Sequence, residues 1–211
     1  MRSFSSTIQN ALLNRSIVFW DFLWLIPRDR GTGNAAPYGF HSGAGNVSAS
    51  VINPLSGTAV TRNFEGAGAL ISISDISAVS TLEPQKVNIH VAQLNDSALS
   101  VVRGYDLKQG RVEMYSGFCD PSTRLLLEPP TCRYQGFVDF VDIQTPKEGE
   151  YGYIDLTCTS HSSELRRTNP DTRSHDSQQL RSSGDGFFKD VVGVSDWNIF
   201  WGQKSDDTAS K

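Results

Sequence analysis

The sequence predicts a mainly β protein with a few short helices, a β-rich α+β fold. Several segments alternate apolar and polar residues with a period of two, as half-buried strands do. Turns rich in Gly, Asn and Pro separate these segments, for example residues 30–37 and 42–46. Only short stretches carry the spacing of an amphipathic helix.

The N-terminal region predicts a short helix followed by a buried strand. In residues 5–14, Ile8, Ala11 and Leu12 share one helical face, and Ser5 or Ser6 can cap the helix. Residues 17–26, IVFWDFLWLI, then predict a buried strand that ends at a proline. This run is about half as long as a membrane-spanning helix and contains an aspartate, so we expect no membrane anchor.

The middle of the chain predicts further strands and one more helix. The expected strands are residues 46–51, 58–64, 70–74, 86–94 and 110–118. The clearest, residues 86–94, directs Val87, Ile89 and Val91 inward, and residues 70–74 should have one wet face. After Asn95 or Asp96 as a cap, a short helix should end near Gly104.

The last third predicts a hairpin and then a change of character. Residues 133–143 and 151–159 form the expected hairpin, with a charged turn at residues 146–149. From Ser160 the chain becomes polar, with helical turns expected at residues 163–166 and 176–181. We therefore expect a β-rich region over residues 1–159, as one domain or two small ones. A polar and aromatic C-terminal arm, residues 160–202, and a disordered tail, residues 203–211, should follow.

Composition narrows the classes of function. A net charge of −4 and an isoelectric point of about 5.5 give no overall basic field, so nucleic acid is not expected as the main partner. Three cysteines are too few for a disulfide framework and suit a protein made in a reducing cytoplasm. No phosphate-binding loop, zinc-protease motif or nucleophile elbow is present. We therefore expect a protein that is not an enzyme and has no catalytic residues.

A metal site is the one cofactor hypothesis that the residues offer. Cys158 and His161 have a C-x-x-H spacing, and Cys119 and Cys132 precede them. Thiolates and an imidazole could bind zinc or iron. Ordinary buried thiols are the favoured alternative, because Cys119 and Cys132 lie thirteen positions apart and do not form the second half of a paired-ligand motif. The expected cofactor is therefore none.

The C-terminal arm carries a family resemblance. Its order is a D-S-Q-Q-L-R stretch at 176–181, a G-D-G-F-F stretch at 184–188 and a W-N-I-F-W-G stretch at 197–202. This order resembles the end of a minor tail protein module of phages. The start of the chain, with a short helix, an aromatic strand and the segment Y-G-F-H at 38–41, resembles the opening of tail-tip hub proteins of siphophages and gene transfer agents, similar to the minor tail protein L of phage lambda.

The resemblance implies a structural role in a virion. It implies tail-hub-like β-barrel or sandwich domains with an irregular C-terminal arm, assembled in the host cytoplasm as a homotrimer at the tail tip or baseplate. The implied partners are the distal tail protein, the central tail fibre protein and the tape measure protein. Some longer relatives carry an iron–sulfur cluster, which three cysteines do not suggest here. The subunit contacts expected in the arm are Asp176, Gln178, Arg181, Asp185, Phe187, Phe188 and Trp201.

The same residues have a second interpretation, and so does the function. The arm could instead bind its own domain, and the residues alone do not decide between the two. The alternative function is a carbohydrate-binding β-sandwich on the tail. It would present aromatic side chains on an exposed face, with Tyr38, Tyr134 and Tyr151 as candidates.

Overall fold

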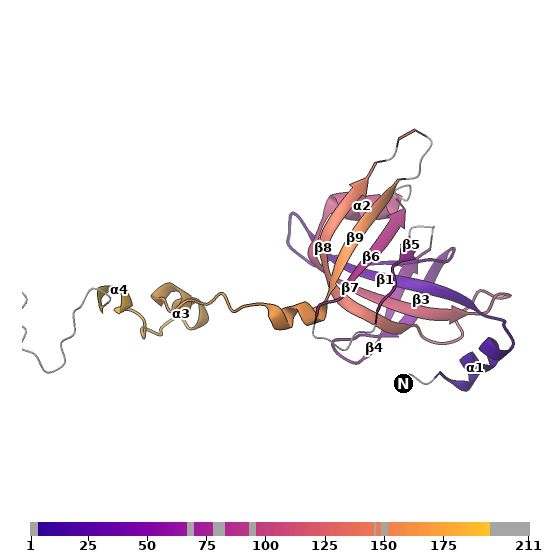
Figure 1. The fold of residues 1–211 in the computed structure, drawn as a ribbon, viewed down its shortest axis with the longest axis horizontal. Helices are drawn as coiled ribbons and strands as arrows, with labels where there is room; N and C mark the ends of the chain where they lie inside the picture. Colours follow the sequence, from indigo (N-terminus) through magenta and orange to yellow (C-terminus); the bar gives the residue numbers. More distant parts are fainter. Residues whose placement is uncertain are drawn as a thin grey trace, which may run out of the picture. The chain divides into compact units, whose positions relative to one another are not determined.

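A computed structural model describes residues 4–66, 70–77, 83–92, 96–145, 147–148 and 152–194. Its contacts divide the chain into two units, Met1–Arg166 and Arg167–Lys211, which we call unit 1 and unit 2. Unit 1 holds all the described strands (Figure 1). None of the described helices is long and apolar enough to cross a membrane.

Unit 1 is mainly β, as the sequence predicts. Its described strands form one nine-stranded mixed sheet that curls into a half-barrel, in the order β3-β4-β2-β1-β7-β8-β9-β6-β5. The strands are β1 (Val18–Asp29), β2 (Tyr38–His41), β3 (Asn46–Ile52), β4 (Ala59–Glu65), β5 (Leu70–Ile73), β6 (Lys86–Ala92), β7 (Tyr105–Cys119), β8 (Thr131–Gln144) and β9 (Tyr153–Ser160). All neighbours pair antiparallel except β2 and β4, which are parallel. Because the sheet curls, β3 contacts β8 and β1 contacts β5, although neither pair is adjacent in the sheet.

The central strands β1 and β7 are buried on both faces. In β1, Phe22 packs on one face and its neighbour Leu23 on the other, and both are fully buried. One core gathers Leu23 and Leu25 with the apolar residues of β6 and β9 and with helix α2 (Asp96–Gly104). The other gathers Trp20 and Phe22 with residues of β3 and β4. In Figure 1 the strands β8, β9 and β6 form one side of unit 1, and α2 contacts β7.

Two strands differ from expectation at or near the sheet centre. We predicted that the first strand ends at Pro27, but β1 continues to Asp29. A register shift between Ile26 and Arg28 lies at the proline, a position where a strand tolerates a missing N–H donor. We also predicted alternation over residues 110–118, yet residues 112–117 are all buried. A strand that packs against a core on each face has no solvent-exposed face, so its residues do not alternate between buried and exposed.

The other strands follow the predicted pattern closely. In β6, Val87, Ile89 and Val91 are buried as expected, while Asn88 is exposed. The predicted hairpin is the pair β8 and β9, and α2 ends at Gly104. The hairpin turn lies largely outside the described residues, as does Asn95, one of the two caps proposed for α2.

The N-terminal helix α1 (Ser6–Leu13) begins where the sequence predicts. Ser5 caps it by accepting a hydrogen bond from the Ile8 N–H at 3.4 Å. Of the three apolar residues expected on one face, only Ile8 is buried, and Leu12 is 42% exposed. Phe4 and Phe19 both pack edge-on against Phe118. Five apolar side chains of this N-terminal region are exposed, and we call them the N-terminal apolar patch: Phe4, Leu12, Leu13, Val18 and Phe19.

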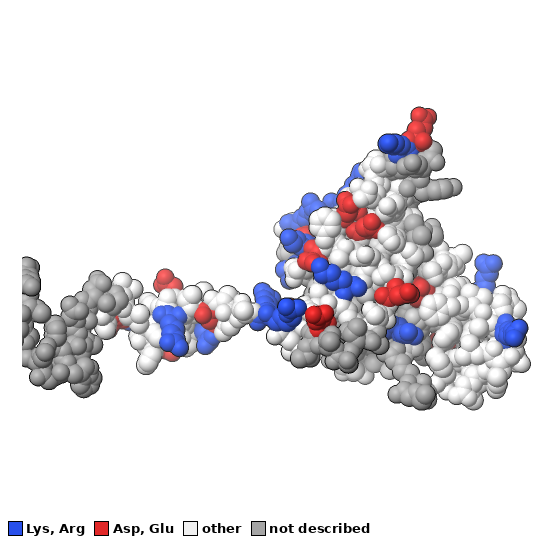
Figure 2. Space-filling view, viewed as in Figure 1, with Lys and Arg blue, Asp and Glu red and all other residues white. Residues whose placement is uncertain are grey.

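The segment after β9 forms short helices. The 3-10 helix η1 (His161–Arg166) belongs to unit 1 and packs on β8. Unit 2 contains α3 (His175–Arg181), where a helical turn is predicted, and α4 (Val191–Val194). Residues 203–211, expected to be disordered, lie outside the described residues. On the face shown in Figure 2, acidic and basic side chains of unit 1 are interspersed.

Candidate functional site

The four candidate metal ligands are not gathered in one place. Cys119 and Cys132 belong to the core around Phe22, and Cys158 belongs to the core around Leu23 on the opposite face of the sheet. His161, at the start of η1, packs its ring 5.3 Å from that of Phe137. All three cysteines are free thiols.

The buried thiols are poor ligands and poor nucleophiles in this setting. Burial raises the pKa of Cys119 to about 11 and that of Cys158 to about 12. Both therefore stay protonated near neutral pH, whereas metal binding and nucleophilic attack need the thiolate. Among the residues that the structure describes, no three His, Cys, Asp or Glu side chains are arranged to hold a metal ion.

Three of the polar residues predicted at a subunit interface, Gln178, Arg181 and Asp185, form bonds within unit 2. Arg181 forms an ion pair with Asp171, and the side-chain amide of Gln178 donates to the carboxylate of Asp185. The Asp185 carboxylate also accepts from the Phe187 N–H at 3.0 Å, and these bonds lower the pKa of its acid group. The Gln178–Asp185 bond therefore braces the turn after α3, and the Arg181–Asp171 pair ties the end of α3 to the segment before it, an option that the sequence reasoning did not include. Asp176 lies exposed in the first turn of α3.

The aromatic residues of the same region are largely uncovered. Phe187 is 80% exposed and packs edge-on against the half-buried Phe188, with ring centroids 4.9 Å apart. Leu180 and Val192 are 91% and 83% exposed. No residue in the described part of unit 2, residues 167–194, is buried. Trp201 lies outside the described residues.

The tyrosines proposed for sugar binding do not form an exposed aromatic face. Tyr134 is only 5% exposed and donates its hydroxyl to the Gln85 carbonyl, so placing it on an exposed face was wrong. The Tyr38 hydroxyl donates to that of Tyr105 at 2.7 Å, and the Tyr38 ring is half-buried. Tyr151 lies outside the described residues.

A buried charged cluster in unit 1 was missed by the sequence reasoning. Arg62 of β4 forms an ion pair with Glu113 of β7, and Glu113 has no exposed surface. The Tyr115 hydroxyl donates to Glu113 at 2.6 Å, and the Arg62 guanidinium lies 4.7 Å from the centre of the Trp24 ring. Burial, then Glu113, raises the pKa of Tyr115. The cluster ties β4 to β7 across the half-barrel, and such a buried network fixes one arrangement of strands.

Period-two alternation could have found this cluster. In residues 58–64, Arg62 and Phe64 have the same parity, so they share one face of the strand. Phe64 is a natural core residue, which places Arg62 in the same core. A buried arginine then requires a buried acid, and only the pairing of distant strands supplies Glu113.

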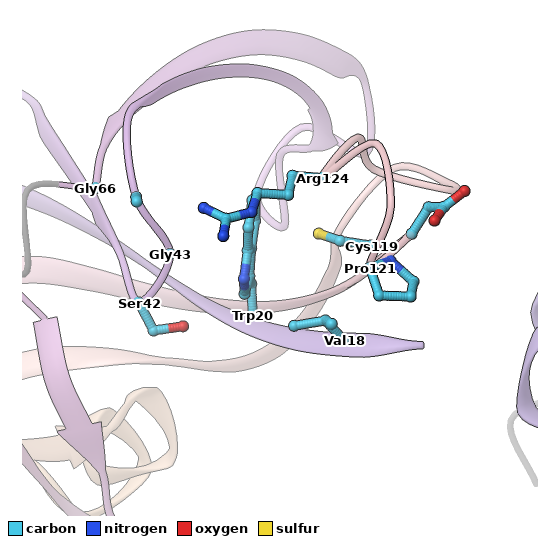
Figure 3. A pocket seen from close by; sticks show the side chains of 10 residues that line it. Val18, Trp20, Ser42, Gly43, Gly66, Cys119, Pro121 and Arg124 are labelled. Atoms are coloured by element: carbon cyan, nitrogen blue, oxygen red, sulfur yellow. The ribbon is translucent and has the colours of Figure 1, made fainter. Parts of the chain in front are cut away.

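A pocket of about 480 Å³ opens between the start of β1, the turn after β2 and the loop after β7 (Figure 3). Its lining includes Val18, Trp20, Ser42, Gly43, Cys119 and Arg124. In Figure 3 the Arg124 side chain reaches toward the Trp20 indole, and the Cys119 sulfur faces the same ring. The pocket combines one cation with an aromatic floor.

A buried histidine shapes one wall of this pocket. The His41 Nδ1 accepts from the Gly43 N–H at 3.1 Å, and its Nε2 donates to the Gly45 carbonyl at 2.7 Å. Burial lowers the pKa of His41, so the ring is neutral near pH 7. A side chain at Gly43 would collide with the Trp20 ring, because a Cβ there would lie 2.5 Å from it. The backbone therefore lies directly on the indole.

No family model matches the chain, and no curated protein matches it significantly.

Proposed function

We propose that this chain is a structural subunit of a phage-type tail tip or baseplate, a hub that links the tail tube or distal tail protein to the central fibre protein. It works as a homotrimer in the virion, in contact with the tape measure protein. Its task is geometric, not catalytic. The proposal is supported by the mainly β half-barrel, by the order of motifs over residues 176–202 and by the surfaces described below.

The exposed apolar side chains of unit 2 carry the proposal. Leu180, Phe187 and Val192 are each at least 80% exposed, and nothing in the described part of unit 2 is buried. A segment that buries so little cannot offset the entropy lost when its chain is ordered. Its helices and turns therefore suit an element that completes its packing against another protein, as subunits of an assembled particle do.

Unit 1 offers a second apolar surface. In the N-terminal apolar patch, the rings of Phe4 and Phe19 both contact that of Phe118, and Leu13 is 80% exposed. Contiguous apolar surface of this kind is typical of protein interfaces. A subunit that joins two neighbours needs at least two such surfaces, and the chain has one in each unit.

Mass spectrometry of purified particles from the producing cells tests the proposal. We expect this chain among the virion proteins, and native mass spectrometry of the isolated protein should detect a trimer. Absence from the particles, or a monomer both in solution and in the particle, would falsify it.

A variant of unit 2 sharpens the test. Changing Leu180, Phe187 and Val192 together to Ser should abolish incorporation into particles while leaving the melting temperature of unit 1 unchanged. The matched control changes the exposed polar residues Gln179, Ser183 and Lys189 to Ala and should be incorporated normally. Equal incorporation of both variants would rule out unit 2 as the assembly element.

A further inference from the structure

The pocket beside Trp20 is lined by one cation, Arg124, and by one acid, Asp120. Arg124 forms no ion pair or side-chain hydrogen bond with any other residue in the described part of the chain. The nearest acid along the loop, Asp120, is already engaged, since its carboxylate accepts from the Ser122 N–H at 2.7 Å and from the Ser122 hydroxyl at 2.6 Å. These bonds lower the pKa of Asp120.

The loop holds Arg124 in a fixed and unusual backbone conformation. Its φ angle is 56°, a left-handed value that residues other than glycine adopt rarely. The Arg124 N–H donates to the Asp120 carbonyl at 2.8 Å, and the Leu127 N–H donates to the Phe118 carbonyl at 2.8 Å. The backbone that carries the exposed Arg124 side chain is therefore bonded back to β7, so less backbone freedom is lost when the side chain binds a ligand.

A second donor is available in the opposite wall. The Ser42 Oγ accepts from the Asp21 N–H at 3.0 Å, and the Ser42 N–H donates to the Asp21 carbonyl. The Ser42 hydroxyl proton has no acceptor among the described residues, so it remains available to a bound oxygen. The space between these donors is apolar, with the Trp20 indole, Val18 and Pro121 around it.

We propose that this pocket binds a carboxylate carried beside a flat apolar group. Arg124 and Ser42 would hold the carboxylate, because guanidinium and hydroxyl donors form charge-assisted hydrogen bonds with it. The flat group would pack against Trp20 and Val18, as aromatic rings do in such pockets. A volume of about 480 Å³ accommodates a ring and an acid together.

Two sources supply this chemistry. One is an acidic side chain next to an aromatic residue in another protein chain, and the other is a free aryl carboxylate. The inference does not depend on the tail-tip proposal, because it rests only on the pocket.

Binding of four small probes to the full chain, followed by ligand-observed NMR and calorimetry, tests the inference. The acids are N-acetyl-Asp-Phe-amide and phenylacetate, and their neutral matches are N-acetyl-Asn-Phe-amide and phenylacetamide. We expect a dissociation constant in the millimolar range for at least one acid, as is usual for ligands of this size. The matching amide should bind about tenfold more weakly, because the charged hydrogen bond is lost.

Two variants connect binding to Arg124. Arg124→Gln should weaken the acid about tenfold and leave the amide unchanged. Arg124→Gly should do the same, and it keeps the loop, since glycine adopts the positive φ angle freely. The control Arg15→Gln removes an exposed arginine that also has a positive φ, 53°, but does not line the pocket. It should bind as the unchanged protein does.

The relative affinities of the probes distinguish the two sources of the ligand and test the inference itself. Tighter binding of the dipeptide acid supports a protein source, and tighter binding of phenylacetate supports a free small molecule. The inference is overturned if neither acid binds, if the amides bind as well as the acids, or if Arg15→Gln loses as much affinity as the Arg124 variants.

Discussion

The two units of the chain differ in the interactions that hold them together. Unit 1 buries Phe22 and Leu23 completely, on opposite faces of one strand. Unit 2 buries no residue in its described part and instead ties its turns with Gln178, Asp185 and the ion pair of Arg181. Hydrophobic burial is the main source of folding free energy, so we expect unit 1 to be more stable than the described part of unit 2. Polar bonds within a segment give it shape more than stability.

The largest expected effect compares one apolar residue from each unit. Phe22→Ala should lower the free energy of unfolding by about 4 kcal/mol, because it leaves a cavity in a packed core. Leu180→Ala, at a side chain 91% exposed, should change it by less than about 0.5 kcal/mol. Urea denaturation followed by circular dichroism measures both. Similar losses for the two variants would contradict the contrast between the units.

The second effect compares the two arginine ion pairs. Arg62→Ala leaves Glu113 buried without its main partner and should cost about 3 kcal/mol. Arg181→Ala breaks an exposed pair and should leave the denaturation midpoint unchanged. The double variant Arg62→Met, Glu113→Leu should recover part of the lost stability, because it removes the buried Glu113 charge but also takes the partner from Arg111, which is 27% exposed. A double variant as unstable as Arg62→Ala would contradict this account.

The third effect compares two glycines. Gly66→Ala should destabilise unit 1 by about 2 kcal/mol. A Cβ at Gly66 would lie 2.2 Å from the His41 Nε2 and 2.5 Å from the Gly45 carbonyl, and the buried ring has little room to move. Gly186→Ala in unit 2 meets no atom within 4 Å and should not shift the thermal melting curve. Equal melting curves for the two variants would show that the Gly66 contact is not tight.

The fourth effect is a dependence on pH that belongs to unit 1. Burial lowers the pKa of His41 in the folded state, so the unfolded chain takes up the proton first as pH falls. Stability should therefore decline below about pH 6.5, by at most about 1.4 kcal/mol per pH unit. Urea titrations between pH 7 and pH 5 measure the slope. His41→Gln should remove most of it, and an unchanged slope in that variant would assign the effect to other groups.

Local sequence patterns were enough to predict the helices and strands, but not how these pack against one another. The alternation in β6 and the Ser5 cap of α1 depend on neighbouring residues, and both were predicted. The burial of β7 on both faces depends on which strands pair and how the sheet curls, which no local period records.

The pocket beside Trp20 and the bonds within unit 2 also depend on contacts that a local sequence pattern does not record. The pocket draws Trp20, Ser42 and Arg124 from three segments of the chain, so no motif marks it. In unit 2 the residues predicted at a subunit interface include Gln178, Arg181 and Asp185, which form bonds within the unit. Their partners could not be foreseen, because Asp171 lies a whole turn and a loop before Arg181.

The pairing of β1 with β7 also governs when unit 1 can fold. Val18 pairs with Cys119, so the ribosome must add about a hundred residues before the central pair exists. At typical rates of 5–20 residues per second, this takes about 5–20 s. During that time β1, the most apolar strand, has no partner on its β7 side and exposes an edge that can pair with other chains. Shielding of nascent β1 by a chaperone, or slow synthesis beyond β2, would therefore control how much of this protein reaches its folded state.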